Sequence, residues 1–210
     1  MRTVAVLPVK SFGRAKQRLR PAGVDRAELA AAMVGDVLEA LAAVRGLDGV
    51  VVVSAERVDG AGIEWVHDPV EAGQSAAALR GVRAAVARGA QRVLLVPGDC
   101  PALDPAEVDE LLASAAPGVV IVPDRHGSGT NALLLDPPTV LTPAFGPGSF
   151  ARHAALAHAA GATVRVGRLP SLELDVDTPG DLAALRAALA AGHGAAPRTR
   201  ALLERLVHAA

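Results

Sequence analysis

The chain has 210 residues, enough for one domain that buries a sizeable core, and its single cysteine, Cys100, excludes an internal disulfide or a thiolate metal cage. Apolar residues make up 51% of the chain and the formal net charge is −1, so it lacks the basic field of a general nucleic-acid binder. No apolar run reaches the roughly 20 residues that span a bilayer. We therefore expect a soluble, cytoplasmic protein with no nucleic-acid or membrane partner.

Strand-like and helix-like segments alternate along the chain. Apolar and β-branched runs predict strands at 3–9, 50–54, 63–67, 92–96, 119–122, 130–135, 163–166 and 172–174. Capping patterns predict helices that begin behind Asp25, Asp104 and Thr178, of which the first runs to about residue 44 and the last to about 191. Further helices are expected at 74–88 and 151–160. A linker at 192–198 precedes a short peripheral helix at 201–209.

This alternation predicts an α/β fold with a Rossmann-like, mostly parallel sheet and helices on both faces, in a single domain over residues 1–191. In such sheets ligands bind beyond the carboxyl ends of the strands. The distinctive loops after Val9, Val96 and Leu174 all follow predicted strands. One cleft can therefore hold all three loops.

Four cations fall within nine residues after the first strand: Lys10, Arg14, Lys16 and Arg18. Among the 21 lysines and arginines of the chain, only Lys10 and Lys16 are lysine, which indicates a site where a compact ammonium is needed. Cations on a strand-to-helix loop suit a polyphosphate. The spacing is not that of a P-loop. The alternatives are a solvated basic loop and a chance distribution of the two lysines.

Three aspartates are candidate ligands of a divalent cation. Asp99 ends a buried strand in the segment Val-Pro-Gly-Asp-Cys-Pro, where a carboxylate can hold Mg²⁺. Asp175 and Asp177 lie two residues apart, so an extended backbone turns both to the same side, where they repel each other unless a metal or a shared proton intervenes. The alternative roles are a loop hydrogen bond for Asp99 and a helix cap for Asp177.

Two glycine-rich segments, 127–131 and 146–149, offer backbone N–H groups and hydroxyls, and the second directly precedes a helix, whose N-terminus attracts anions. Together they favour a second anionic substrate, although each can be an ordinary turn. Gln74 and Ser75 open another helix and are candidates for base or ribose contacts or for simple capping. The histidines His67, His126, His153 and His158 show no metal-ligand spacing, and we expect surface or loop positions for them.

Six motifs occur in an order that identifies a family. They are Pro-Val-Lys-x5-Lys-x-Arg-Leu at 8–19, Gly-Gln-Ser at 73–75, Pro-Gly-Asp-Cys-Pro at 97–101, Gly-Thr-Asn-Ala-Leu at 129–133, Phe-Gly-Pro-Gly-Ser-Phe at 145–150 and Leu-Asp-Val-Asp-Thr-Pro-x-Asp-Leu at 174–182. Over residues 1–190 the chain resembles the CofC/FbiD family, the guanylyltransferases of coenzyme F-420 biosynthesis. The first and last motifs are shared by the wider MobA-like nucleotidyltransferase superfamily, and the Gly-Gln-Ser triplet departs from the Gly-Leu-Asn that the family often carries.

The resemblance implies a MobA-like fold and the transfer of GMP from GTP to a small phosphorylated acid, phosphoenolpyruvate or 2-phospho-L-lactate, with release of pyrophosphate. It implies one or two Mg²⁺ ions on Asp99 and on Asp175 or Asp177, and acceptor binding by Thr130, Gly146 and Ser149. Lys10, Arg14 and Lys16 are then expected to hold the triphosphate of GTP. Gln74 and Ser75 are expected to contact its nucleoside. A homodimer and a hand-over of the product to the next enzyme of the pathway are left open.

Two other functions compete with this one. A MobA-like enzyme can place GMP or CMP on another phosphorylated acceptor, although the first loop lacks the Gly-Gly-x-Ser-x-Arg-Met pattern of such enzymes. A catalytically silent nucleotide-binding module has no chemical need to keep mutually repelling carboxylates together. The aspartates therefore favour an enzyme.

Overall fold

The computed structural model describes residues 1–14 and 25–207, which form a seven-stranded mixed sheet in the order β3-β2-β1-β4-β6-β5-β7. The strands are β1 (Thr3–Pro8), β2 (Gly49–Ser54), β3 (Ile63–His67), β4 (Arg92–Leu95), β5 (Gly118–Pro123), β6 (Thr130–Asp136) and β7 (Val164–Val166). Strand β6 runs antiparallel to β4 and β5, and the other neighbouring pairs are parallel. The mostly parallel sheet predicted from the sequence is confirmed.

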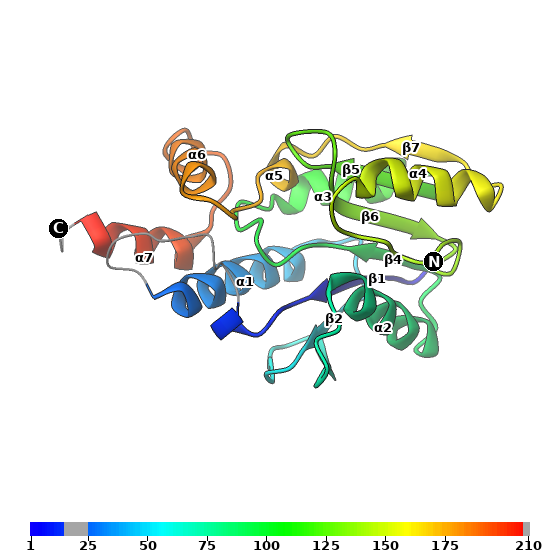
Figure 1. Cartoon of the computed structure of the whole chain (residues 1–210), viewed down its shortest axis with the longest axis horizontal. Coiled ribbons are helices and arrows are strands. Elements are labelled where there is room, and N and C mark those ends of the chain that lie inside the picture. The colour runs from blue at the N-terminus through cyan, green and yellow to red at the C-terminus, as the bar shows by residue number, and fades with distance from the viewer. Residues whose placement is uncertain (15–24, 208–210) are drawn as a thin grey trace.

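Helices cover both faces of this sheet (Figure 1). They are α1 (Arg26–Ala42), α2 (Gln74–Ala87), α3 (Pro105–Ser114), α4 (Ser149–Ala159), the short α5 (Pro170–Glu173), α6 (Pro179–Ala190) and α7 (Pro197–Val207), with a 3-10 turn at Phe12–Arg14. Ala5 and Leu7 of β1 pack with α1 and α3, whereas Val4 and Val6 pack with α2. Successive side chains of a strand point to opposite faces and both faces are covered, so residues 4–7 of this strand are all apolar and buried.

Capping predictions made from the sequence are confirmed at three helices. The side chains of Asp25 and Asp104 accept hydrogen bonds from the backbone two residues later, at the starts of α1 and α3. Thr178 and Asp181 form a reciprocal capping box at the start of α6. Each side chain satisfies a backbone N–H that the first turn of a helix leaves without a partner. Local sequence alone therefore fixes these three helix starts.

The strand that we predicted at 172–174 is wrong. The segment forms the helical turn α5, which begins at Pro170 and buries Leu172 completely. The carboxylate of Glu107 on α3 accepts hydrogen bonds from the backbone and the hydroxyl of Ser171, at 3.1 and 2.8 Å. A proline at the first helical position favours this turn, and three apolar residues are too few to distinguish a strand from a buried turn.

Helix α7 begins at Pro197, earlier than the peripheral helix that we expected at 201–209, and it packs on α1. The buried carboxylate of Asp36 on α1 accepts hydrogen bonds from the backbone of Arg198 and Thr199, at 2.9 and 2.8 Å. Leu202 and Leu203 join a buried cluster with α1 and α6. This helix is therefore tied to the body of the fold, and the domain boundary at residue 191 stays a prediction. Among the described helices, none is long and apolar enough to cross a membrane.

Candidate active site

An open cavity of about 680 Å³ lies at the carboxyl ends of β1 and β4. These two strands are parallel neighbours, so the loops that follow them leave the same edge of the sheet. The first loop contributes Lys10 to the cavity and the second contributes Asp99. The other polar residues that line it are Asp68, Glu71, Gln74 at the start of α2 and Asp177 before α6. The apolar side of the cavity is formed by residues of α1, among them Met33.

The cavity therefore brings together Lys10, Gln74, Asp99 and Asp177, which the sequence placed far apart. Lys10 is exposed. Ser75 follows Gln74 on α2 but does not line the cavity. Lys16 and Arg18 lie outside the described residues, and so does the side chain of Arg14.

Asp175 lies beside Asp99 and Asp177 in an electrostatically unfavourable position. Burial raises the pKa of the Asp175 carboxyl, and the negative charges of Asp99 and Asp177 raise it further, while a hydrogen bond from Asn131 opposes them. The backbone N–H of Val176 donates to the carbonyl oxygen of Asp99 at 3.1 Å and holds the two segments together. Carboxylates held together against their repulsion fit a site that receives a cation.

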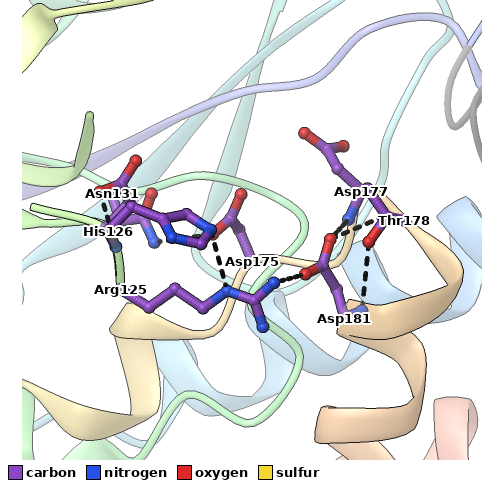
Figure 2. A network of polar contacts seen from close by, with 8 residues as sticks. Arg125, His126, Asn131, Asp175, Asp177, Thr178 and Asp181 are labelled. Atoms are coloured by element: carbon purple, nitrogen blue, oxygen red, sulfur yellow. Dashed lines mark hydrogen bonds and ion pairs between the residues drawn. The ribbon is translucent and has the colours of Figure 1, made fainter. Parts of the chain in front are cut away.

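The side chain of Asp177 does not cap α6, which was its alternative role. Thr178 accepts a hydrogen bond from the Asp181 backbone at 3.3 Å, and the Asp181 carboxylate accepts from the backbone of Asp177 and Thr178 at 3.0 and 2.7 Å. Figure 2 shows the Asp177 carboxylate directed away from this cap. The Asp177 backbone thus donates to the carboxylate of the capping box, and Asp177 lines the cavity.

Asn131 contacts a candidate site residue, and sequence reasoning gave it no role of its own. Its side-chain amide donates to the carbonyl oxygen of Leu172 at 2.7 Å and to the carboxylate of Asp175 at 3.3 Å. Figure 2 shows Asn131 near Asp175. Asn131 is buried on β6 and lies 44 residues from Asp175 in the chain. The Gly-Thr-Asn motif was the available signal, but only the packing of α5 against β6 shows what the asparagine contacts.

The glycine-rich loop before Thr130 folds around the side chain of Asp124. Its carboxylate accepts hydrogen bonds from the backbone of His126, Ser128 and Gly129, at 3.0 to 3.1 Å. Arg125 extends from the same loop and forms an ion pair with Asp181 of the α6 cap (Figure 2). The loop therefore connects the start of β6 to the segment that carries Asp175 and Asp177.

The two segments expected to bind the acceptor meet at the start of α4. The backbone N–H of Phe150 donates to the carbonyl oxygen of Ser128 at 3.2 Å, which joins the 146–149 loop to the loop before Thr130. Gly146 and Gly148 have φ values of 111° and 70°, which favour glycine because a side chain is strained there. The Ser149 backbone N–H donates to the carbonyl oxygen of Gly146 at 3.0 Å, so only the Ser149 hydroxyl can serve a ligand.

The surface or loop position that we expected for His153 is wrong. His153 lies on α4 with no exposed surface, and its two ring nitrogens contact the Thr130 hydroxyl at 3.0 Å and the Ala144 backbone N–H at 2.9 Å. Burial lowers the pKa of His153 to about 4, and the neighbouring Arg152 lowers it in the same direction. A histidine whose polar atoms are both satisfied can be buried, and spacing in sequence gives no sign of this.

Comparison with known proteins decides the family. Residues 3–208 match the family described as "Guanylyl transferase CofC like". The chain belongs to this family. The match extends beyond residue 190, where we had ended the resemblance, and takes in α7.

Two relatives carry the name phosphoenolpyruvate guanylyltransferase. The protein from Conexibacter woesei is 50% identical in an alignment of 218 positions, which covers 99% of this chain and 97% of the relative. The protein from Sphaerobacter thermophilus is 39% identical, over 92% of this chain and 94% of its own. The resemblance that we inferred from six motifs is therefore confirmed over nearly the full length.

Solved structures share the fold. A nucleotidyl transferase from Methanothermobacter aligns with a TM-score of 0.66 and 20% identity, covering 91% of this chain and 99% of its own. A Mycobacterium tuberculosis protein solved as a complex with manganese aligns with a TM-score of 0.51 and 22% identity, covering 88% and 98%. At these identities the likeness establishes the nucleotidyltransferase fold of this CofC-like chain.

The carboxylates fit a metal that GTP helps to hold. Across residues 1–14 and 25–207, no three histidine, cysteine, aspartate or glutamate side chains converge into a metal site of their own. Magnesium in nucleotide enzymes is commonly bound by one or two carboxylates, with the substrate phosphates and water completing its shell. The exposed Asp177 and half-buried Asp99 line the cavity from two sides, and both act on Asp175. This donor set suits such a shared site.

Proposed function

We propose that this chain transfers GMP from GTP to phosphoenolpyruvate and releases pyrophosphate, as a step in coenzyme F-420 biosynthesis. The observation that carries the proposal is the 50% identity, over 99% of the chain, with a protein named phosphoenolpyruvate guanylyltransferase. The cavity supports the proposal, because Lys10, Asp99 and Asp177 of the family motifs all line it. The acceptor 2-phospho-L-lactate remains the alternative from the sequence.

The chemistry is an in-line displacement. An oxygen of the acceptor's phosphate attacks the α-phosphorus of GTP, a new P–O bond forms, and the bond to the pyrophosphate oxygen breaks. The attacking phosphate is already an anion, so the step needs no general base. The difficulty is to bring two polyanions together. Positioning of the two substrates and stabilisation of charge in the transition state therefore provide most of the rate acceleration.

The residues of the first loop and of the cavity divide this work. Lys10 is proposed to bind the triphosphate and to stabilise charge on the leaving pyrophosphate, with Arg14 and Lys16 beside it. Gln74 and Ser75 are proposed to contact the nucleoside from the start of α2. The exposed position of Lys10 at the cavity supports its role.

Asp99, together with Asp175 or Asp177, supplies the proposed ligands of Mg²⁺. A bound divalent cation neutralises phosphate charge and orients the reacting oxygens. Asn131 holds the carboxylate of Asp175 from β6, and the Asp99 carbonyl holds the backbone of the 175–177 segment. These contacts hold the Asp175 carboxylate and join the backbones of the two segments without a nucleotide, which reduces the ordering that binding must impose.

Thr130, Gly146 and Ser149 are proposed to bind the acceptor. The hydroxyls of Thr130 and Ser149 and the backbone of the glycine-rich loop are donors suited to a carboxylate or a phosphate. Both residues are almost fully buried, with 7% and 1% of their surface exposed, so a hydrogen bond that they make to an anion is shielded from water. A cytoplasmic location, a homodimer and a hand-over of the product to the next enzyme stay predictions from the sequence.

A pyrophosphate-release assay tests the function. Purified protein with GTP and Mg²⁺ is given phosphoenolpyruvate, 2-phospho-L-lactate or 3-phosphoglycerate in parallel, and CTP replaces GTP in a matched set. We expect release with GTP and phosphoenolpyruvate only, and a new guanosine diphosphate diester in the mass spectrum. Preference for 2-phospho-L-lactate reassigns the acceptor, and activity with CTP and another acceptor favours the wider superfamily. No release with any pair, from a protein that binds GTP, supports the silent module.

A further inference from the structure

The buried His153 lies directly behind a residue of the proposed acceptor site. It projects from α4 and contacts the Thr130 hydroxyl at the start of β6 through Nδ1, at 3.0 Å. Its Nε2 contacts the Ala144 backbone N–H in the loop before α4, at 2.9 Å. Phe145 packs edge-on against the ring, with 5.1 Å between ring centroids. The imidazole is thus held from three sides in one orientation.

These contacts allow only one arrangement of hydrogens. A backbone N–H can only donate, so Nε2 must accept from Ala144 and cannot carry a hydrogen. The ring is neutral near neutral pH, because burial and the charge of Arg152 lower the pKa of His153 to about 4. A neutral imidazole carries one hydrogen, which must therefore be on Nδ1 and point to the Thr130 oxygen.

The direction of this bond determines what the Thr130 hydroxyl can do. Its oxygen accepts from His153, so its own hydrogen is available for donation to another group. Within residues 1–14 and 25–207, no other group hydrogen-bonds to the Thr130 hydroxyl. Its neighbours in the fold are the loop before β6 and the start of α4, which Phe150 joins through Ser128.

We propose that His153 is a positioning residue that donates its Nδ1 hydrogen to Thr130 and so commits the Thr130 hydroxyl to donate to the anionic acceptor. The inference rests on the proposed function and extends it to a residue that touches no substrate. The Ala144 backbone N–H determines the tautomer of His153, and this tautomer determines the direction of the hydrogen bond to Thr130. The Thr130 hydroxyl then donates to a carboxylate or phosphate oxygen. A hydroxyl fixed as a donor favours an anion over a ligand that must itself donate.

The same helix also shapes the acceptor loop from outside. The guanidinium of Arg152 donates to the backbone carbonyls of Ala144 and Pro147, at 3.1 and 3.0 Å. His153 holds the same segment through the Ala144 backbone N–H, so a substitution at position 153 moves the loop as readily as the hydroxyl. The test must separate the two effects.

Two variants provide that separation. His153→Asn and His153→Leu both lose the ring and its contact with Ala144, since neither side chain extends as far as Nε2. They differ at the position of Nδ1, where asparagine can place an N–H donor and leucine only a methyl group. We expect the acceptor KM of the leucine variant to exceed that of the asparagine variant by about tenfold, with the same KM for GTP in both.

The matched background is Thr130→Val, which keeps the shape of threonine and removes the hydroxyl. In this background the asparagine and leucine variants should have equal acceptor KM, because no hydroxyl remains to be oriented. If the difference between them persists without the hydroxyl, or is absent when the hydroxyl is present, His153 acts through the loop and the proposal is overturned.

A readout independent of activity completes the experiment. In protein labelled with ¹⁵N-histidine, the signal that the His153→Asn variant lacks is assigned to His153, and long-range ¹H–¹⁵N correlations give its tautomer. We expect the neutral Nδ1–H form at neutral pH, whether or not the protein turns over phosphoenolpyruvate. An imidazolium or an Nε2–H tautomer would refute the proposal by itself, whereas loss of the proposed function leaves this signal unchanged.

Discussion

Acidification should destabilise this chain through His153. The pKa of its imidazole falls from 6.5 in the unfolded chain to about 4 in the folded one, because burial disfavours the charged ring. Between these two values the unfolded chain binds a proton that the folded chain does not, so stability falls as the pH falls through that window. Above this pH window the neutral His153 contributes its full share to the stability of the fold. Below the window that share is lost.

The difference between the two pKa values sets the size of the effect. Each unit corresponds to about 1.4 kcal/mol, so the full loss is about 3 kcal/mol, and about 2 kcal/mol of it is reached at about pH 5. Domains are stable by about 5–15 kcal/mol, so this loss is a large fraction of the total. Protonation also places a donor on Nε2, where the Ala144 backbone N–H already donates.

Urea unfolding followed by circular dichroism measures the effect. The wild type and His153→Asn are unfolded at neutral pH and at about pH 5, so that the carboxylates common to both cancel in the comparison. The stability of the wild type relative to the variant should fall by about 2 kcal/mol between the two conditions. Parallel losses in both proteins would show that His153 titrates normally in the folded state and would refute the reasoning.

Three further predictions concern the carboxylates. Asp99→Asn should lower turnover roughly a thousandfold, since a metal ligand contributes several kcal/mol to the transition state, and near wild-type pyrophosphate release would contradict its role. Asp175→Asn should abolish most activity yet raise the Tm of the ligand-free protein, because it removes a charge that burial and Asp99 disfavour; an unchanged or lower Tm in a scanning calorimeter argues against that repulsion. Asp36→Asn should destabilise the fold by about 2 kcal/mol in urea, because one backbone N–H of α7 then faces an amide donor, while the acceptor KM stays unchanged.

The sequence determined those features that depend on neighbours in the chain. Caps such as Asp25 and Asp104 satisfy backbone groups within their own first turn, so local pattern was enough to locate the starts of α1 and α3. The order of six motifs was enough to identify the family, which the match over residues 3–208 confirmed. Loops that follow parallel strands must meet at one edge, and Lys10 and Asp99 do line one cavity.

Only the tertiary structure decided which distant groups meet. Asn131 contacts Asp175 because α5 is a turn packed on β6, where sequence had predicted a strand. The Asp177 side chain is not the cap of α6, because Thr178 and Asp181 form its capping box between them. The sequence predicted a surface or loop position for His153, and only the structure shows Thr130 and Ala144 as the partners of its two ring nitrogens. A buried polar group is tolerated only where its partners converge, and periodicity carries no information about partners from other elements.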